Sequence, residues 1–334
     1  ETNDVFEVFI VAGTGGTPFK LNSQMPEGGD VIDIGLPGAG RVVFLADQEA
    51  DEQFDLFVAS VATGHAERLN PALIDGGDVL GFIPSDPLIY LADQRVDDVF
   101  EAFRVDLDGG LPVPLNAPLV EGGDVTGATL GASGILLYLA DQEVDEQFEL
   151  YAVRVEDAAP AVKLNAEMPE EGDVIAFAVS ADGSRVVYAA DQDTDNIIEL
   201  YSVSLDADVD GRLDALDCLP TEAEAWALPG EVVVLTLEHT GPEETTLRWS
   251  PPPEPGGTVV AYDVLRSPRA ADFVKGTTCL AWKEGSALEL VDETAPAPHG
   301  ALFYLVRPRN GCGSGPAGHD SDGQPTPARH CSAV

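Results

Sequence analysis

Hydrophobic and polar residues alternate in short runs along the first two thirds of the chain. Residues 173–179 form an apolar, β-branched run that ends at the turn sequence Ser180-Ala181-Asp182-Gly183. A second run covers residues 185–190, and after an acidic stretch residues 198–203 alternate between apolar and polar side chains. Period-two alternation between turn signals is typical of β-strands. Because helical spacing is not sustained here, the pattern predicts an all-β fold.

The same pattern occurs four times, at a period in the forties. Three short motifs mark each copy: Leu-Ala-Asp-Gln or Ala-Ala-Asp-Gln, Gly-Asp-Val, and Leu-Asn. Their polar residues are Asp47, Asp93, Asp141 and Asp191, then Asp30, Asp78, Asp124 and Asp173, and finally Asn22, Asn70, Asn116 and Asn165. Self-similarity at such a period indicates stacked supersecondary units. With four short strands in each unit, the sequence predicts β-propeller blades over residues 1–205.

The number of strands does not decide whether the propeller forms a closed ring. Residues 5–22 supply the last two strands of one blade, three full blades follow, and residues 173–205 supply three strands. The total is one strand more than four blades require. One alternative is a closed ring of four blades with a spare strand. The other is an open arc whose edges need upstream repeats or another copy of the chain, because unpaired edge strands are templates for assembly.

The repeat resembles that of TolB-like propellers, in which a strand ending in Ser-Asp-Arg is followed by a Glu-Leu-Tyr strand and a Gly-Gly turn. The matching residues here are the Ala-Asp-Gln sequences, Glu149-Leu150-Tyr151, Glu199-Leu200-Tyr201 and Asp108-Gly109-Gly110. Gln replaces Arg, and the acidic turn that follows is longer. The resemblance implies a variant of the TolB-like propeller, a fold that usually has more than four blades.

The charge of the chain limits its partners. It has 17 basic against 59 acidic residues, a net charge of −42. Such a surface repels nucleic acid and anionic lipid, and no apolar run reaches the roughly 18 residues that a membrane helix needs. We therefore predict neither nucleic-acid binding nor membrane insertion. The acidity suits a protein that binds divalent metal or lives in salt, or it serves only solubility.

One acidic segment has the spacing of a calcium loop. Counted from Asp206, side-chain oxygens fall at positions 1, 3, 5, 9 and 12, a glycine (Gly211) at position 6, and a backbone carbonyl at position 7. The predicted Ca²⁺ ligands are Asp206, Asp208, Asp210, Asp214 and Asp217, with the carbonyl of Arg212. Asp rather than Glu at position 12 makes the loop more similar to dockerin or thrombospondin type 3 loops than to an EF-hand. We expect Ca²⁺ to stiffen a linker over residues 206–227, and the alternative is a metal-free acidic linker.

The acids of the repeats allow two interpretations as well. The stretch Asp141-Gln142-Glu143-Val144-Asp145-Glu146 and its counterparts could hold Ca²⁺ in every blade. Asp in a turn also accepts backbone N–H bonds without any metal. We favour the second interpretation, in which the repeated Asp and Gln side chains are hydrogen-bond anchors between blades.

Residues 228–334 have a different pattern, in which Pro-rich turns separate about seven strand-like runs, and this pattern predicts a β-sandwich. This part resembles a fibronectin type III domain. Trp249 takes the place of the strand-B Trp, Tyr262-Asp263-Val264 that of strand C, and the run from Tyr304 to Gly311 that of strand F. The resemblance implies adhesion, spacing or assembly and no chemistry. Trp226 and Trp282 are expected in the core or at a domain contact.

All four cysteines, Cys218, Cys279, Cys312 and Cys331, lie after the repeats. An even number confined to one module indicates two disulfides and an oxidising location, so we predict an exported bacterial protein, extracellular or at the cell surface. Of the three possible pairings we favour Cys218–Cys279 with Cys312–Cys331.

The search for catalytic motifs gives no candidate residues. The sequence has no Gly-x-Ser-x-Gly, no His-Glu-x-x-His and no phosphate-binding loop, and only His65 of the five histidines lies in the repeats. We therefore predict a non-enzymatic, self-associating structural protein of a cell-surface or filamentous assembly. The alternatives are a propeller that binds a surface glycan or protein, as an adhesin or sensor, and a secreted carboxylate-based lyase or hydrolase.

Overall fold

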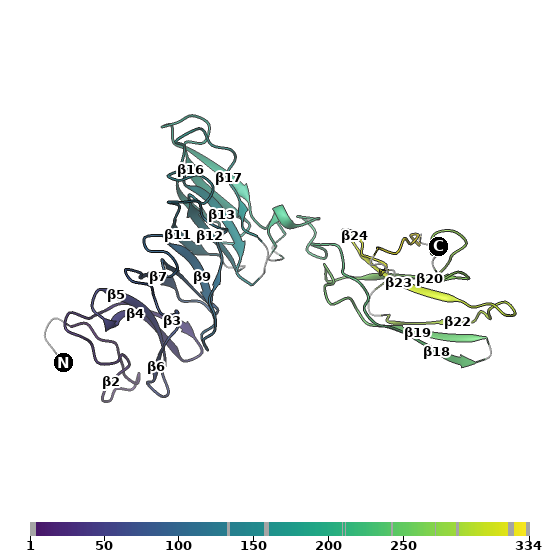
Figure 1. Cartoon of the computed structure of the whole chain (residues 1–334), viewed down its shortest axis with the longest axis horizontal. Helices are drawn as coiled ribbons and strands as arrows, with labels where there is room; N and C mark the ends of the chain where they lie inside the picture. Colours follow the sequence, from purple (N-terminus) through teal and green to yellow (C-terminus); the bar gives the residue numbers. More distant parts are fainter. Residues whose placement is uncertain are drawn as a thin grey trace. The chain divides into compact units, whose positions relative to one another are not determined.

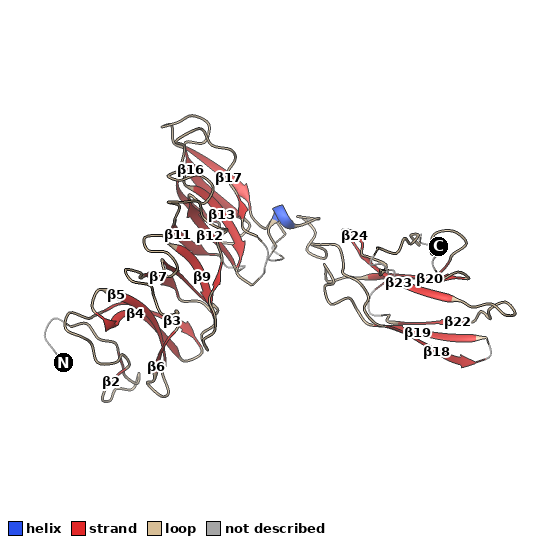
Figure 2. Cartoon of the chain, in the orientation of Figure 1, coloured by secondary structure: helices blue, strands red, loops and turns tan. Residues whose placement is uncertain are grey.

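The computed structural model describes residues 5–131, 134–156, 160–208, 210, 212–241, 243–270, 272–284, 287–319 and 324–331. The chain divides into two compact units, Glu1–Ser204 and Leu205–Val334, which are described separately. Among the described residues the regular structure is β-strand, apart from one short 3₁₀ helix, η1 (Asp214–Leu216) (Figure 2). The prediction of an all-β chain is confirmed.

Three consecutive four-stranded antiparallel sheets form the middle of the first unit. Their strands are β3 (Val31–Gly38), β4 (Arg41–Ala50), β5 (Gln53–Ser60) and β6 (Ala66–Arg68); β7 (Val79–Ile83), β8 (Leu88–Ala92), β9 (Glu101–Val105) and β10 (Val113–Pro114); and β11 (Val125–Leu130), β12 (Ile135–Ala140), β13 (Glu149–Arg154) and β14 (Val162–Lys163). Within each sheet the strands follow in chain order. Each sheet is thus a four-stranded meander, the form of a propeller blade.

The sheets at the two ends of the first unit are smaller. The first has two strands, β1 (Phe9–Ile10) and β2 (Phe19–Lys20), and the last has three, β15 (Val174–Val179), β16 (Arg185–Ala190) and β17 (Glu199–Ser204). No strand of the first sheet pairs with a strand of the last among the described residues, and Figure 1 shows the sheets in succession from the purple to the teal end of this unit. The partial blades are where the strand count predicts them. Of the two predicted alternatives, the structure has the open arrangement.

The four larger sheets of this unit each have two chemically different faces. A cross-strand pair of stacked rings marks one of them: Phe44–Phe57, Tyr90–Phe103, Tyr138–Tyr151 and Tyr188–Tyr201, with ring centroids 5.3–5.4 Å apart. We call this the aromatic face. The opposite, aliphatic face carries residues such as Val43, Leu45, Leu56 and Val58 in the β3–β6 sheet.

The core of the first unit lies between consecutive sheets. Leu45 and Leu56, on the aliphatic face of the β3–β6 sheet, pack in one cluster with Tyr90 and Phe103, on the aromatic face of the next sheet. The next junction repeats this arrangement, with Ile89 and Ala102 packed against the pair Tyr138–Tyr151. Each sheet therefore depends on its neighbours to cover both faces, as expected for a repeat architecture.

Two facing antiparallel sheets build most of the second unit. One has the strand order β18 (Leu235–Gly241), β19 (Glu244–Trp249), β22 (Glu289–Asp292), and the other has the order β21 (Thr278–Glu284), β20 (Ala261–Ser267), β23 (Phe303–Asn310), β24 (Gly313–Ser314). Trp249 of the first sheet is buried and meets Tyr262 of the second edge to face, with ring centroids 5.6 Å apart. The two sheets share this core, while the fibronectin type III resemblance stays a prediction. The side chain of Trp282 lies outside the described residues.

The disulfides of the second unit correct the predicted pairing. Cys218 is bonded to Cys312 and Cys279 to Cys331, with Cα atoms 5.6 and 5.7 Å apart. The prediction was wrong because it followed proximity in the sequence. The turn after β23 instead brings Cys312 to the segment that precedes the sandwich, where Asn310 donates hydrogen bonds to the carbonyls of Ala227 and Gly256. Two disulfides indicate an oxidising compartment.

The last described segment is held on β23. The buried Arg307 pairs with the buried Asp263 at 2.6 Å and also donates to the carbonyls of Ala328 and Arg329. Arg309 donates to the carbonyl of Cys331 at 3.1 Å. These bonds fix Cys331 beside Cys279 of β21.

Candidate metal site and the repeated carboxylates

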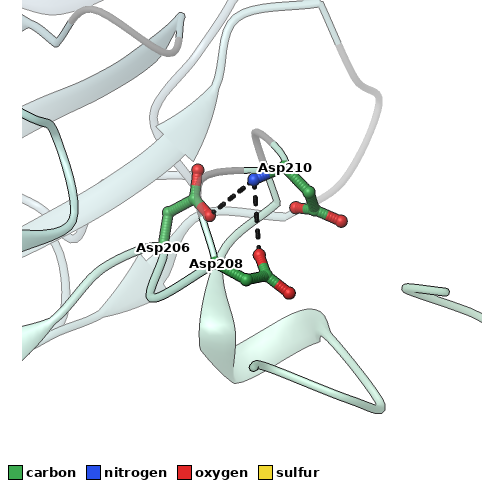
Figure 3. Close-up of side chains that lie close together, drawn as sticks. All are labelled: Asp206, Asp208 and Asp210. Atoms are coloured by element: carbon green, nitrogen blue, oxygen red, sulfur yellow. Dashed lines mark hydrogen bonds between the residues drawn. The ribbon is translucent and has the colours of Figure 1, made fainter. Parts of the chain in front are cut away.

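Three of the predicted calcium ligands come together immediately after the last repeat. One oxygen each of Asp206, Asp208 and Asp210 lies within 4.8 Å of the others, and Asp206 is only 1% exposed. The backbone N–H of Asp210 donates to Oδ1 of Asp206 at 3.1 Å and lies 3.3 Å from Oδ1 of Asp208, as Figure 3 shows. The loop therefore curls around the backbone of Asp210, and the three carboxylates converge.

The electrostatics of this cluster are unfavourable without a counter-charge. Oδ2 of Asp208 and Oδ2 of Asp210 are buried atoms with no hydrogen-bond partner among the described residues. Burial raises the pKa of Asp210, although the N–H of Arg212 opposes the shift, and the charges of Asp208, Asp217 and Asp206 raise this pKa further. Buried acceptors that lack a donor are costly, so a cation is the group that would stabilise this arrangement best. Oxygen ligands of this kind suit Ca²⁺.

The other predicted ligands lie around the cluster but not within it. Asp214, at the start of η1, accepts the backbone N–H of Ala207 at 2.8 Å, and Asp217 accepts that of Leu219 at 2.6 Å. The guanidinium of Arg212 lies over the ring of Trp226, 5.5 Å from its centroid. Gly211, predicted to make the sharp bend, lies outside the described residues.

The segment that follows the acidic loop belongs to the second unit. The backbone N–H of Trp226 donates to the carbonyl of Gly256 at 2.9 Å, and the N–H of Thr258 donates to that of Glu224 at 2.8 Å. Together with the Cys218–Cys312 bond, these contacts attach residues 218–227 to the sandwich. Of the predicted linker over residues 206–227, only the acidic loop, residues 206–217, therefore lacks these contacts.

In the repeats, each Asp of the Ala-Asp-Gln motif is buried and uses both carboxylate oxygens. Oδ1 accepts the backbone N–H of the Asp of the Gly-Asp-Val motif, at 2.5–2.6 Å in all four copies. Oδ2 accepts the N–H of the residue five positions further on, at 2.9–3.1 Å. That residue, for example Glu146 with φ of 62°, has a left-handed backbone. These acids therefore hold a turn and need no metal to do so.

The Asp of the Gly-Asp-Val motif forms the bond between sheets. Its Oδ1 accepts the backbone N–H of a Phe in the preceding repeat: Asp30 from Phe6, Asp78 from Phe54, Asp124 from Phe100 and Asp173 from Phe148, at 2.5–2.8 Å. The predicted anchor between blades exists, but it is a relay of two aspartates. The first aspartate orients the backbone of the second, and the second reaches the neighbouring sheet.

The Gln of the motif has two roles. Gln48 and Gln192 accept the N–H of Ser23 and Ala166 in the preceding repeat, both at 2.9 Å. Gln94, Gln142 and Gln192 accept the hydroxyls of Tyr90, Tyr138 and Tyr188, respectively, so Gln192 has both roles. The Leu-Asn residues act within one sheet, where Asn70 accepts the N–H of Leu56 at 2.8 Å and donates to the carbonyl of Pro71.

One charge pair of the repeats was missed by the sequence reasoning. In the first and third complete sheets a basic residue of the fourth strand meets acids: Arg68 with Glu49, and Lys163 with Glu143 and Glu149. The β7–β10 sheet has Pro114 at that strand position, and Arg95 replaces the turn acid. Arg95 forms a bidentate pair with the buried Glu101. Alignment of the repeats shows both exchanges, which could have revealed the pair.

The grooves of the first unit differ in the chemical groups that line them. A groove of about 630 Å³ runs along Arg95, Glu101, Pro114 and residues 118–122. Its lining contains no Ser, Cys or His, and its cation is already bound to Glu101. His65, the histidine of the repeats, is an exposed side chain whose Nδ1 lies 3.5 Å from Glu67. His65 lines a second groove, of about 530 Å³, together with Ser60, Thr63 and Glu67. Among the described residues its ring contacts Glu67 rather than either hydroxyl, so no nucleophile is paired with a base there.

Comparison with known proteins gives distant likenesses of fold. No protein-family model matches the chain, and no curated protein sequence does. The chain is similar to the structure of a putative TolB from Agrobacterium tumefaciens (12% identity, TM-score 0.35, covering 60% of this chain and 70% of that one). It is also similar to an oligogalacturonate lyase from Vibrio parahaemolyticus (13%, 0.39, 61% and 61%) and to prolyl oligopeptidase B from Galerina marginata (11%, 0.37, 87% and 39%).

These likenesses are to TolB-like and lyase structures that share the propeller type of fold, and they support no functional argument. The chain spans less than two thirds of the lyase and less than half of the peptidase. Among the described residues, no helix has the length and apolar character that crossing a bilayer requires.

Proposed function

We propose that this chain is a non-enzymatic structural protein of the cell exterior, which assembles with itself through the open strand edges of its repeat array. The observation that carries the proposal is that the last sheet has three strands where the earlier ones have four. Within the part of the chain that the structure describes, β17 pairs with β16 alone, whereas β5, β9 and β13 each have a further strand on their outer side. An unpaired strand edge is a template for pairing with another chain.

The open edge of β17 can be described atom by atom from its equivalent, β13. There the N–H of Leu150 donates to Oδ1 of Asn165, and its carbonyl accepts the N–H of Leu164. Leu200 of β17 aligns with Leu150, but no Leu-Asn strand follows it before the acidic loop. The outward N–H and C=O groups of Leu200 and Ser202 would therefore be the ones that pair with a strand from another molecule.

The acidic loop supports the same proposal as a structural metal site. Ca²⁺ bound by Asp206, Asp208 and Asp210 would neutralise the cluster and order the first residues of the second unit. The fibronectin-like sandwich, stabilised by two disulfides, would then serve as a spacer. Disulfides and calcium together suit an extracellular or cell-surface location.

Multi-angle light scattering after size exclusion tests the proposal, with the full chain in Ca²⁺ or in EDTA. We expect species larger than a monomer in Ca²⁺ and a lower thermal midpoint in EDTA. The variant Ser202→Pro removes an outward N–H of β17 while its β16 pairing remains, since Pro is tolerated at sheet edges; it should reduce assembly. Asp210→Asn should abolish the effect of EDTA on the midpoint. A chain that is monomeric in all conditions would contradict the proposal.

A further inference from the structure

We infer that the aliphatic face of the last repeat sheet, β15–β17, is a docking surface for a second copy of this chain. This inference rests on the proposed self-assembly, but it places the main contact on a sheet face rather than on a strand edge. The partner is the first sheet, β1–β2, of the next copy, so that the copies stack end to end.

Comparison with the earlier repeats shows that the equivalent positions of this face are buried elsewhere. Leu200 is 78% exposed, whereas Leu56 and Leu150, at the same position of earlier sheets, are 0% exposed. Val187 is likewise exposed where Val43 and Leu137 are fully buried. In every earlier sheet, these positions lie under the following sheet. The last sheet keeps the side chains of an internal junction, but no described residue of the first unit follows to cover them.

The face is also uncharged over most of its area, which is unusual in so acidic a chain. The strand register places on it Ala176, Ala178, Val187, Ala189, Leu200 and Ser202. Arg185 stands at one end of the face and donates to the hydroxyl of Ser202 at 3.2 Å. Two strongly negative molecules can associate through an apolar surface that carries no acidic side chains.

The occupant follows from the internal junctions, where an aliphatic face always meets an aromatic face. On β1–β2 the corresponding face carries Phe9, which stands opposite Lys20 in the strand pairing, and Lys20 is ion-paired with Glu7. Phe9 aligns with Phe57 and Phe103, yet it is 44% exposed, whereas those rings are 1% exposed. Val11 is exposed where Ala59 and Val105 are buried. The end-to-end contact would therefore place Phe9 where one ring of each pair lies at the internal junctions.

Such a contact is heterologous, because two different surfaces meet. Heterologous contacts produce closed rings or open filaments rather than two-fold dimers. Each copy also carries a net charge of −42, and this repulsion is screened by salt. Association through an apolar face should therefore strengthen as the salt concentration rises.

The test uses two single variants of the full chain at 1 M NaCl, measured by sedimentation velocity. Leu200→Asp and Phe9→Asp change exposed side chains, so both variants should fold, which circular dichroism and thermal midpoints verify. Each should weaken self-association at least tenfold. Leu80→Asp, at an apolar position on β7 whose exposure of 57% lies between those of Phe9 and Leu200 and which is on neither end sheet, is the matched control and should assemble like the wild type.

Mixing the two variants decides the geometry. The Leu200→Asp chain keeps an intact first sheet, and the Phe9→Asp chain keeps an intact last sheet. An equimolar mixture should form a one-to-one dimer that neither variant forms alone. If Phe9→Asp dimerises by itself, or if the mixture stays monomeric while the wild type assembles, the inferred contact is wrong.

The outcomes also separate this inference from the proposed function. If the wild type assembles, Ser202→Pro prevents it and Leu200→Asp does not, edge pairing stands and the face contact is rejected. If the wild type is monomeric at every salt and calcium concentration, both are rejected.

Discussion

The carboxylate of Asp78 accepts the backbone N–H of Phe54 at 2.8 Å, across the junction between two consecutive sheets. Asp78 is itself held through its own N–H by Asp93, at 2.5 Å. The same relay occurs at every junction of the array. It fixes the position of each sheet on the next, whereas the apolar side chains between the sheets supply most of the burial.

Removal of this anchor should destabilise the first unit. Asp78→Ala leaves the N–H of Phe54 without its acceptor, which costs roughly 1–3 kcal/mol. Asp78→Asn keeps an acceptor oxygen and should cost less. Urea unfolding followed by circular dichroism measures both, with Asp106→Ala, an exposed aspartate in a turn, as the control. Equal stabilities for Asp78→Ala and the control would show that the bond is dispensable.

The exchanged charge pair of the β7–β10 sheet can be tested by restoring the pattern of its neighbours. Arg95→Glu should destabilise the chain by roughly 1–2 kcal/mol, because the buried Glu101 loses a charged partner that is itself half exposed. The double variant Arg95→Glu with Pro114→Arg places a cation where Arg68 stands in the β3–β6 sheet. We expect it to recover at least half of the loss in urea unfolding. No recovery would mean that the repeats are not interchangeable at this point.

The disulfide pairing is open to direct mapping. Digestion without reduction should give linked peptides that contain Cys218 with Cys312 and Cys279 with Cys331. Replacing Cys279 and Cys331 by Ala opens a link across 52 residues, and should lower the stability of the second unit by about 4 kcal/mol. Its thermal transition should move while that of the first unit stays in place. A peptide linking Cys218 to Cys279 would contradict the structure.

The pH dependence of stability should reveal the turn-holding aspartates. The N–H groups of Asp173 and Asn196 hold the pKa of Asp191 below its ordinary value of 3.8. A carboxyl whose pKa is lowered by folding stabilises the protein above that ordinary value, and the contribution is lost as the pH falls through the lowered pKa.

The variant Asp191→Asn isolates this contribution. Its thermal midpoint should lie below that of the wild type at pH 6, and the difference should shrink as the pH falls below about 4. Asp106→Asn, the control, should show no such convergence. A difference that stays constant from pH 6 to pH 2 would rule out a role for the charge of Asp191.

Much of the candidate site could be predicted because its three converging aspartates lie close together in the sequence. The spacing of Asp206, Asp208 and Asp210 within five residues is enough to predict convergence, since a short loop cannot separate them widely. The structure does bring these three together. Asp214 and Asp217 are further along the chain, and their carboxylates accept local backbone N–H groups instead. Sequence spacing could not reveal that competition.

The sequence by itself determined the elements of this protein: alternation, turn residues and a repeated motif specify strands, their order and the partial blades at both ends. These depend on interactions between residues close in the chain. Only the tertiary structure decided the pairing of Cys218 with Cys312, the relay from Asp93 through Asp78 to Phe54, and the exposure of Leu200. Each of these depends on which segments meet in space. Leu150 and Leu200 have the same local sequence, and only the presence or absence of a following sheet buries one and exposes the other.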